Sequence, residues 1–598
     1  MKTPTNSASR LTAALLGLLG LLGLLPLPAV AADDLEIGRR IYLEGRLPSG
    51  RPLSGVRFDG TAVSGAEAAC VSCHRRSGLG SVEGNIVVPP ITGKFLFASD
   101  EAPLATMDQR RRKSFNQAHE PYDEASFARA VRQGIAIDGR TMQVVMPHYA
   151  LGNPELRALT TYLRQLSAAW SPGVTEESIR LATVITPGVS AARRQALLDT
   201  LRSAVAQKNG STAPGRRHMV SPAEMMSRSE RNWQLDVWEL QGEPSTWAAQ
   251  LAENYRRQPV FALLSGVTDS TWQPVHEFCR QEGVPCWFPS VDLPAAQEDF
   301  YNLYFSRGVV LEADVLARHL LDSPGPRPKR LIQIHRDNAV GQAAAQALAA
   351  NLAGSGITLD NRPLGMADPL PPQLNNIDET DAVMFWLAPA DLQSLAELSP
   401  GPARRVFFSG ELGNIQESSF PPAWKSVARL VYPYELPAQR AANLAYFHTW
   451  LKLRRLPLVD ETLQSEAYFA ISFLSDTLAE MLHNVHRDYL LERAEEMLSK
   501  REGGKAEEEA RMRLYLGRPG DLTRKYGTGN RQAATRDLPL SDSPAQAGPA
   551  SDAPRRAGTT IYPRLSLAQH QRFASKGAYI VRFDPQGKLV VDTEWTIP

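Results

Sequence analysis

Cys70-Val71-Ser72-Cys73-His74 is the stretch around which the N-terminal part of this 598-residue chain is organised. Its C-x-x-C-H spacing is that of a covalent c-type haem attachment site. Two thiols three residues apart add to the two vinyl groups of one haem, and the next residue presents an imidazole to the iron. A bare C-x-x-C would also fit a redox dithiol or half of a zinc site. Because His74 adjoins the motif, we predict one covalent haem c held by Cys70 and Cys73, with His74 as an iron ligand.

The sequence on both sides of this motif predicts helices. Residues 35–42 and residues 125–134 place apolar side chains at helical spacing. Residues 154–167 predict a third helix, with Asn153 as its N-cap and Pro154 at its first position.

This region resembles a class I cytochrome c domain between residues 33 and 168. The resemblance implies an all-α fold that transfers electrons through one haem. The matching features are a first helix with Gly38 and Tyr42, the haem motif, the turn Asp138-Gly139-Arg140, Met146-Pro147, and a closing helix with Leu159 and Tyr162.

Met146 is the predicted second axial ligand of the iron. In the family that this region resembles, the axial methionine precedes a proline and a closing helix, as Met146 does here. A thioether is a soft ligand that favours Fe(II), which suits electron transfer. Met107, Met142 and His148 are the alternatives, and a methionine of the core is the simplest other interpretation of Met146.

The N-terminus has the pattern of a secretory signal peptide. A positively charged start is followed by an apolar run over residues 11–27 and by Ala29-Val30-Ala31, an A-x-A cleavage site. We therefore expect cleavage after Ala31 and a periplasmic protein with no stable membrane span. An uncleaved anchor is the alternative, but the apolar run is short for a span.

Composition narrows the choice of partners and of cysteine chemistry. Lys and Arg together number 65 and Asp and Glu 64, so no nucleic-acid partner is expected. The haem motif uses two of the four cysteines and leaves Cys279 and Cys286. In an oxidising compartment these two would form a disulfide that closes a short loop, contributing about 2–3 kcal/mol. Two buried free thiols are the alternative.

After Ser171-Pro172-Gly173 the pattern changes to apolar strands that alternate with helices. This order predicts a parallel sheet with helices on both faces, and ligands of such sheets bind beyond the carboxyl ends of the strands. The predicted strands are residues 179–185, 260–265, 284–288, 330–335, 382–387 and 406–409, and the predicted helices are residues 191–208, 272–281 and 342–353.

The same region resembles the type I periplasmic solute-binding proteins of the branched-chain amino-acid class. The resemblance lies in the order of elements and in the stretches 260–266 and 283–289. It implies a two-lobed α/β domain whose pocket binds a small-molecule solute. By the same resemblance, Ser265 and Ser290 would hold a ligand carboxylate and Glu411 would face an amino group. Each of the three is otherwise an ordinary polar loop residue.

The expected architecture is therefore multidomain, an all-α cytochrome c domain followed by an α/β two-lobed domain like a periplasmic binding protein. Residues 500–558 are polar and rich in Gly, Pro, Ser and Ala, which indicates a surface insertion or a disordered loop. The predicted parts are the signal peptide 1–31, the cytochrome c domain 32–170, a linker 171–178, the solute-binding-like domain 179–499, the polar segment 500–558 and a closing hairpin within 559–598.

Two functions are compatible with this organisation. In the first, the haem exchanges electrons with a periplasmic redox partner protein, and the solute-binding-like domain sets location, partner or regulation. In the second, solute binding for transport or sensing is the main task, and the haem reports redox state. We expect an electron carrier or binding protein rather than an enzyme, because an axial methionine leaves no open iron position for substrate chemistry.

Overall fold

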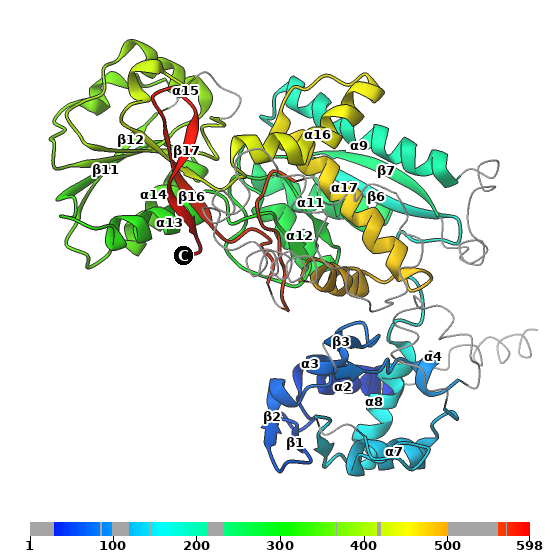
Figure 1. Cartoon of the computed structure of the whole chain (residues 1–598). Helices are drawn as coiled ribbons and strands as arrows, with labels where there is room; N and C mark the ends of the chain where they lie inside the picture. The colour runs from blue at the N-terminus through cyan, green and yellow to red at the C-terminus, as the bar shows by residue number, and fades with distance from the viewer. Residues whose placement is uncertain are drawn as a thin grey trace, which may run out of the picture. The chain divides into compact units, whose positions relative to one another are not determined.

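The computed structural model describes residues 29–598 except 84–85, 99–118, 143–144, 213–230, 366, 416–419, 500–559 and 570. The chain divides into two compact units, an N-terminal unit that ends at Ala169 and a C-terminal unit that begins at Trp170 (Figure 1). Most of the predicted signal peptide and the polar segment 500–558 lie outside the described residues.

Helices α2 (Ala29–Glu44) and α8 (Asn153–Gln165) form the base of the N-terminal unit. They pack closely because α2 carries Gly38, where a Cβ atom would lie 2.2 Å from the carbonyl oxygen of Ala158. Helix α7 (Glu124–Gln133) begins at a capping box, in which the Asp123 side chain accepts from the backbone of Ser126. The three helices predicted from sequence are thus confirmed.

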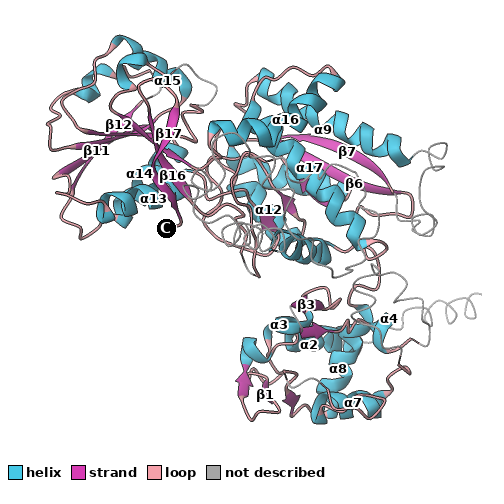
Figure 2. Cartoon of the chain, viewed as in Figure 1, coloured by secondary structure: helices cyan, strands magenta, loops and turns pink. Residues whose placement is uncertain are grey.

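Two expectations for this unit are corrected. The predicted cap of α8 is wrong by one residue, since Gly152 is the N-cap and the Asn153 side chain accepts from Arg132 at 2.8 Å. The unit is also not all-α (Figure 2). Short strands form because the segment after α2 doubles back on itself at Gly60, whose positive φ of 84° suits a turn. The strands are β1 (Ser54–Val56), β2 (Ala62–Ser64) and β5 (His148–Tyr149) in one sheet, and β3 (Ser81–Glu83) with β4 (Ile86–Val88) in another.

The C-terminal unit begins with a parallel five-stranded sheet in the order β10-β9-β8-β6-β7, which we call the β6 sheet. Its strands are β6 (Ser178–Ile185), β7 (Asn232–Glu239), β8 (Ala262–Leu264), β9 (Cys286–Trp287) and β10 (Asn302–Leu303). The helices that accompany it are α9 (Ala191–Thr212), α11 (Trp247–Arg257), α12 (Gln273–Glu282), α16 (Pro437–Arg454) and α17 (Glu461–Met481).

The second sheet has seven strands in the order β12-β11-β13-β14-β15-β16-β17, and we call it the β11 sheet. Its first five strands are parallel, and the C-terminal pair β16–β17 closes it as an antiparallel hairpin, as predicted. The strands are β11 (Arg330–Arg336), β12 (Thr358–Leu364), β13 (Ala382–Trp386), β14 (Arg405–Ser409), β15 (Ala428–Tyr432), β16 (Ala578–Phe583) and β17 (Leu589–Thr596), with helices α13 (Val309–Asp322), α14 (Ala339–Asn351) and α15 (Pro389–Ser394).

Each sheet has a separate hydrophobic core, and the chain crosses between the two halves at three places. The crossings follow β10, follow β15 and precede β16. They are tied to one another by backbone hydrogen bonds, Glu435 N to Ile561 O at 2.7 Å and Ser575 N to Phe305 O at 2.6 Å. All six strands and three helices predicted for this unit are present, although β8 and β9 are shorter than expected.

Candidate functional site

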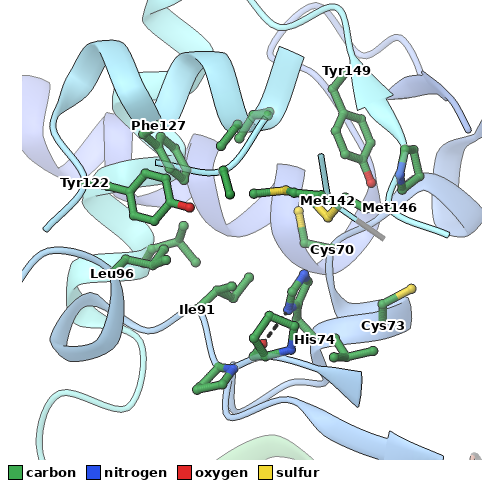
Figure 3. A pocket seen from close by; sticks show the side chains of 18 of the residues that line it. Cys70, Cys73, His74, Ile91, Leu96, Tyr122, Phe127, Met142, Met146 and Tyr149 are labelled. Atoms are coloured by element: carbon green, nitrogen blue, oxygen red, sulfur yellow. Dashed lines mark hydrogen bonds between the residues drawn. The ribbon is translucent and has the colours of Figure 1, made fainter. Parts of the chain in front are cut away.

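The haem attachment motif forms a single helical turn, α3 (Val71–His74), with Cys70 as its N-cap. The His74 backbone N–H donates to the Cys70 carbonyl at 2.9 Å, so the two cysteines and the histidine project from one turn. All three line a cavity of about 530 Å³ (Figure 3). Burial raises the pKa of the Cys70 thiol to about 12.

His74 is held as a neutral imidazole. The residue is 6% exposed, and its Nδ1 lies 3.0 Å from the carbonyl oxygen of Pro89. Because a carbonyl only accepts, this contact places the proton on Nδ1 and leaves the Nε2 lone pair available to a metal. Burial also lowers the His74 pKa to about 4, so protonation does not compete with ligation near neutral pH.

Two methionines face this histidine's cavity. Met142 and Met146 both line it, both are half-buried, and Figure 3 shows both beside Cys70. His148 packs its ring edge-on against Phe58, with ring centroids 4.3 Å apart. A Cβ atom on Gly134 would lie 2.3 Å from His148 Nε2, so that nitrogen is directed at the backbone near Gly134. Met107 lies outside the described residues.

The cavity fits a haem by its chemistry as well as by its ligands. Its wall is mainly apolar, with Ile91, Leu96 and Phe127 among the lining side chains. Two cationic side chains, Lys94 and Arg57, also line the cavity. Burial lowers the Lys94 pKa to about 8, and Arg57 Nε is buried without a hydrogen-bond partner among the described residues. Such groups would pair with the propionates of a haem, while the apolar wall would hold the ring.

The predicted solute residues come from both halves of the C-terminal unit. Ser265 and Ser290 follow β8 and β9, and the Ser290 N–H donates to the Gly266 carbonyl at 2.9 Å, so their loops adjoin at the carboxyl edge of the β6 sheet. Ser265 is fully buried, has a φ of 55°, and its hydroxyl has no partner among the described residues. Glu411 follows β14, at the carboxyl edge of the β11 sheet.

Further acidic residues gather near Glu411 that the sequence reasoning missed. Glu312 on α13 accepts from the N–H groups of Gly410 and Glu411, at 2.9 and 3.0 Å, and from the Ser409 hydroxyl. Glu466 on α17 accepts from the Tyr562 hydroxyl at 2.6 Å. Neither residue belongs to a recognisable sequence motif, because each is a single acid within a largely buried helix.

Cys279 and Cys286 are both fully buried and belong to the same core cluster. They are free thiols in this structure, and burial, with a side-chain hydrogen bond to Cys286, raises the pKa of the Cys279 thiol. Their pairing as a disulfide stays a prediction.

The described residues offer no other obvious metal centre or membrane segment. No group of three or more His, Cys, Asp and Glu among them is arranged to hold a metal ion. None of the helices described is both long enough and apolar enough to cross a bilayer.

The chain is similar to known proteins at two levels, a family model and solved structures. No curated protein matches this chain in sequence. The solved structures similar to it include a fatty acid ABC transporter substrate-binding protein from Thermomonospora curvata (14% identity, TM-score 0.46, covering 72% of this chain and 95% of that one). Another is a branched chain amino acid ABC transporter from Thermus thermophilus with bound valine (9% identity, TM-score 0.46, covering 71% of this chain and 98% of that one). A third is an ABC transporter solute binding protein from R. palustris in complex with benzoate (12% identity, TM-score 0.45, covering 70% of this chain and 97% of that one). Residues 59–167 match the family model of cytochrome c, which confirms the expected resemblance and identifies this part of the chain as a cytochrome c domain.

Proposed function

We propose that this chain is an exported c-type cytochrome that transfers electrons to or from a periplasmic redox partner through one covalent haem. The observation that supports this most strongly is the placement of Cys70, Cys73 and His74 on one helical turn at a cavity that Met146 also lines. A haem bound there would supply one-electron chemistry between Fe(III) and Fe(II).

The chain's own residues would tune and protect that chemistry. Cys70 and Cys73 would hold a haem by thioether bonds, and the Pro89 carbonyl holds His74 in the tautomer whose Nε2 could ligate iron. Met146 would supply a thioether sulfur as a further iron ligand, which would favour the reduced state. The apolar wall would shield a bound haem from water, and iron ligation by both His74 and Met146 would leave no iron position for substrate, which supports a carrier rather than an enzyme.

We propose that the C-terminal unit is a two-lobed solute-binding domain. Two sheets with separate cores, three crossings, and Ser265, Ser290 and Glu411 at strand carboxyl ends support this assignment. Transport or sensing, with the haem as a redox reporter, is therefore the second candidate function. A redox titration with and without bound solute distinguishes the two, because any coupling between solute and haem is reciprocal.

Export and attachment are tested on the purified protein. N-terminal sequencing should begin after Ala31, and haem staining of a denaturing gel should show haem migrating with the polypeptide. Cys70→Ser combined with Cys73→Ser should abolish the stain, while Cys279→Ser should retain it. Haem that stays with the double variant would overturn the attachment assignment.

A further inference from the structure

The end of α16 and the loop that joins it to α17 expose apolar and cationic side chains together. This segment, residues 452–459, is yellow in Figure 1, and we call it the α16–α17 corner. Leu453 is 78% exposed, Leu458 52% and Val459 45%. Only two other large apolar side chains are exposed in the described part of the C-terminal unit. Apolar side chains concentrated in this way on a surface mark an interaction site, whereas single exposed ones need no explanation.

Hydrogen bonds fix the backbone of the α16–α17 corner. Arg455 caps α16 in the left-handed conformation, with a φ of 57°. Gln464, which is 1% exposed, accepts from the Val459 N–H at 2.8 Å, and its amide donates to the Pro457 carbonyl at 3.0 Å. The exposure of the apolar side chains is therefore a feature of an ordered turn and not of a frayed end.

The positive charge of the corner is not compensated. Lys452, Arg454 and Arg455 are exposed, and none of them forms an ion pair with a residue that the structure describes. The sequence has no acid over residues 436–459, and the two acids that follow each pair with an arginine outside the corner. Cations in the last turn of a helix interact favourably with its dipole. That interaction accounts for the cations but not for the exposed leucines beside them.

This combination of side chains matches a membrane surface that carries anionic phospholipids. Apolar side chains enter the headgroup layer of such a surface, and cations are attracted to its negative charge. Lys and Arg suit the boundary because their stems are apolar while their charged ends reach water and phosphate. Leu453, which follows one cation and precedes two others in sequence, can enter a fluid surface directly. A protein partner would instead have to supply an acidic pocket of matching shape.

We propose that the α16–α17 corner docks the protein on a membrane surface that carries anionic phospholipids. Leu453 and Leu458 enter the headgroup layer, and Lys452, Arg454 and Arg455 pair with lipid phosphates. Docking through a few side chains is reversible, unlike insertion of a spanning helix. None of these residues is assigned to the haem or to a solute, so this inference goes beyond the proposed function and does not depend on it.

Co-sedimentation of the full-length holoprotein with lipid vesicles tests this proposal. Vesicles made of equal parts of phosphatidylglycerol and phosphatidylcholine are compared with vesicles of phosphatidylcholine alone. We expect binding to the anionic vesicles only, and weaker binding in about 1 M salt than in about 0.1 M salt because salt screens the charges. Arg454→Gln combined with Arg455→Gln should weaken binding roughly twentyfold, since each cation at an anionic surface contributes about fivefold in affinity. Leu453→Ser should weaken it roughly fivefold, because less apolar surface leaves water.

Arg256→Gln combined with Arg257→Gln is the matched control for charge. These two arginines are also exposed and also end a helix, α11, but Arg256 pairs with Glu253. Ile597→Ser is the control for Leu453→Ser, because Ile597 is 52% exposed and lies outside the corner. Both controls should bind the anionic vesicles as the unsubstituted protein does.

Three results would overturn the proposal. Equal weakening by the two arginine pairs would show general electrostatic adsorption rather than docking at the corner. Absence of binding to anionic vesicles in about 0.1 M salt would exclude the membrane as the partner. Binding that Leu453→Ser does not weaken would show that no apolar side chain enters the lipid, which would point to an acidic partner protein instead.

Discussion

Glu466→Gln is expected to stabilise the C-terminal unit at about pH 8 and to flatten its pH dependence. Glu466 is 5% exposed, and burial raises its pKa from 4.5 to about 7. The folded protein therefore holds this proton more tightly than the unfolded chain does. The stability that follows is fully present below about pH 4.5 and is lost as the pH rises through about 7.

The size of this effect follows from the same two pKa values. The pKa of Glu466 changes from 4.5 to about 7, and each pKa unit is worth ~1.4 kcal/mol. The change therefore corresponds to about 3 kcal/mol in the free energy of unfolding. Between about pH 5 and pH 8 the unsubstituted protein should lose roughly 2–3 kcal/mol through Glu466 alone. Glutamine keeps an acceptor for Tyr562 but carries no charge, so the variant should not show this part of the loss.

Urea denaturation followed by tryptophan fluorescence measures this directly, because all 10 tryptophans of the chain lie at or after Trp170. Glu379→Gln, at an exposed surface position, should leave the pH dependence unchanged. A Glu466→Gln protein with the same loss between about pH 5 and pH 8 as the unsubstituted protein would refute the reasoning. So would a C-terminal unit that gains stability over that range.

Three further outcomes are expected. Gly38→Ala should destabilise the N-terminal unit by about 1–3 kcal/mol in denaturation followed by haem absorbance, because its Cβ would lie 2.2 Å from a facing carbonyl oxygen. Mass spectrometry after alkylation under denaturing, non-reducing conditions should find Cys279 and Cys286 unmodified if they are paired, and two added alkyl groups would contradict the disulfide. Residues 32–170 should fold alone with haem, and residues 175–598 should fold alone without it, since each unit has its own core. Circular dichroism measures the folding of each fragment, and an unfolded spectrum from either would contradict this prediction.

The haem attachment site could be predicted because its chemistry needs residues that are contiguous in the chain. Cys70, Cys73 and His74 fall on one helical turn whatever surrounds them. The second axial ligand is harder, because Met142 and Met146 are close in sequence and both line the cavity. Only the position of each sulfur relative to the iron distinguishes them, and sequence spacing does not specify it.

In the C-terminal unit, prediction from sequence worked for buried strands and failed for exposed strands and for contacts between distant segments. Strands β6, β11 and β13 were predicted because they are rich in apolar residues and are largely buried on both faces. Strands β7 and β12 were missed because they lie at sheet edges and alternate with polar or exposed residues. The contacts of Glu312 with Glu411 and of Glu466 with Tyr562 could not be predicted either, since the partners are far apart in sequence and meet only in the folded chain.

Absorption spectroscopy of the oxidised Met146→Ala protein tests the proposed electron-transfer site most directly, with Met142→Ala as its matched control. Both methionines line the same cavity, so loss of apolar packing alone should affect the two variants alike. We expect the unsubstituted protein to show the weak sulfur-to-iron band at the red end of the visible spectrum. Met142→Ala should keep this band. Met146→Ala should lose it and should have a lower reduction potential. A band that survives in Met146→Ala and disappears in Met142→Ala would contradict the assignment of Met146 to the iron.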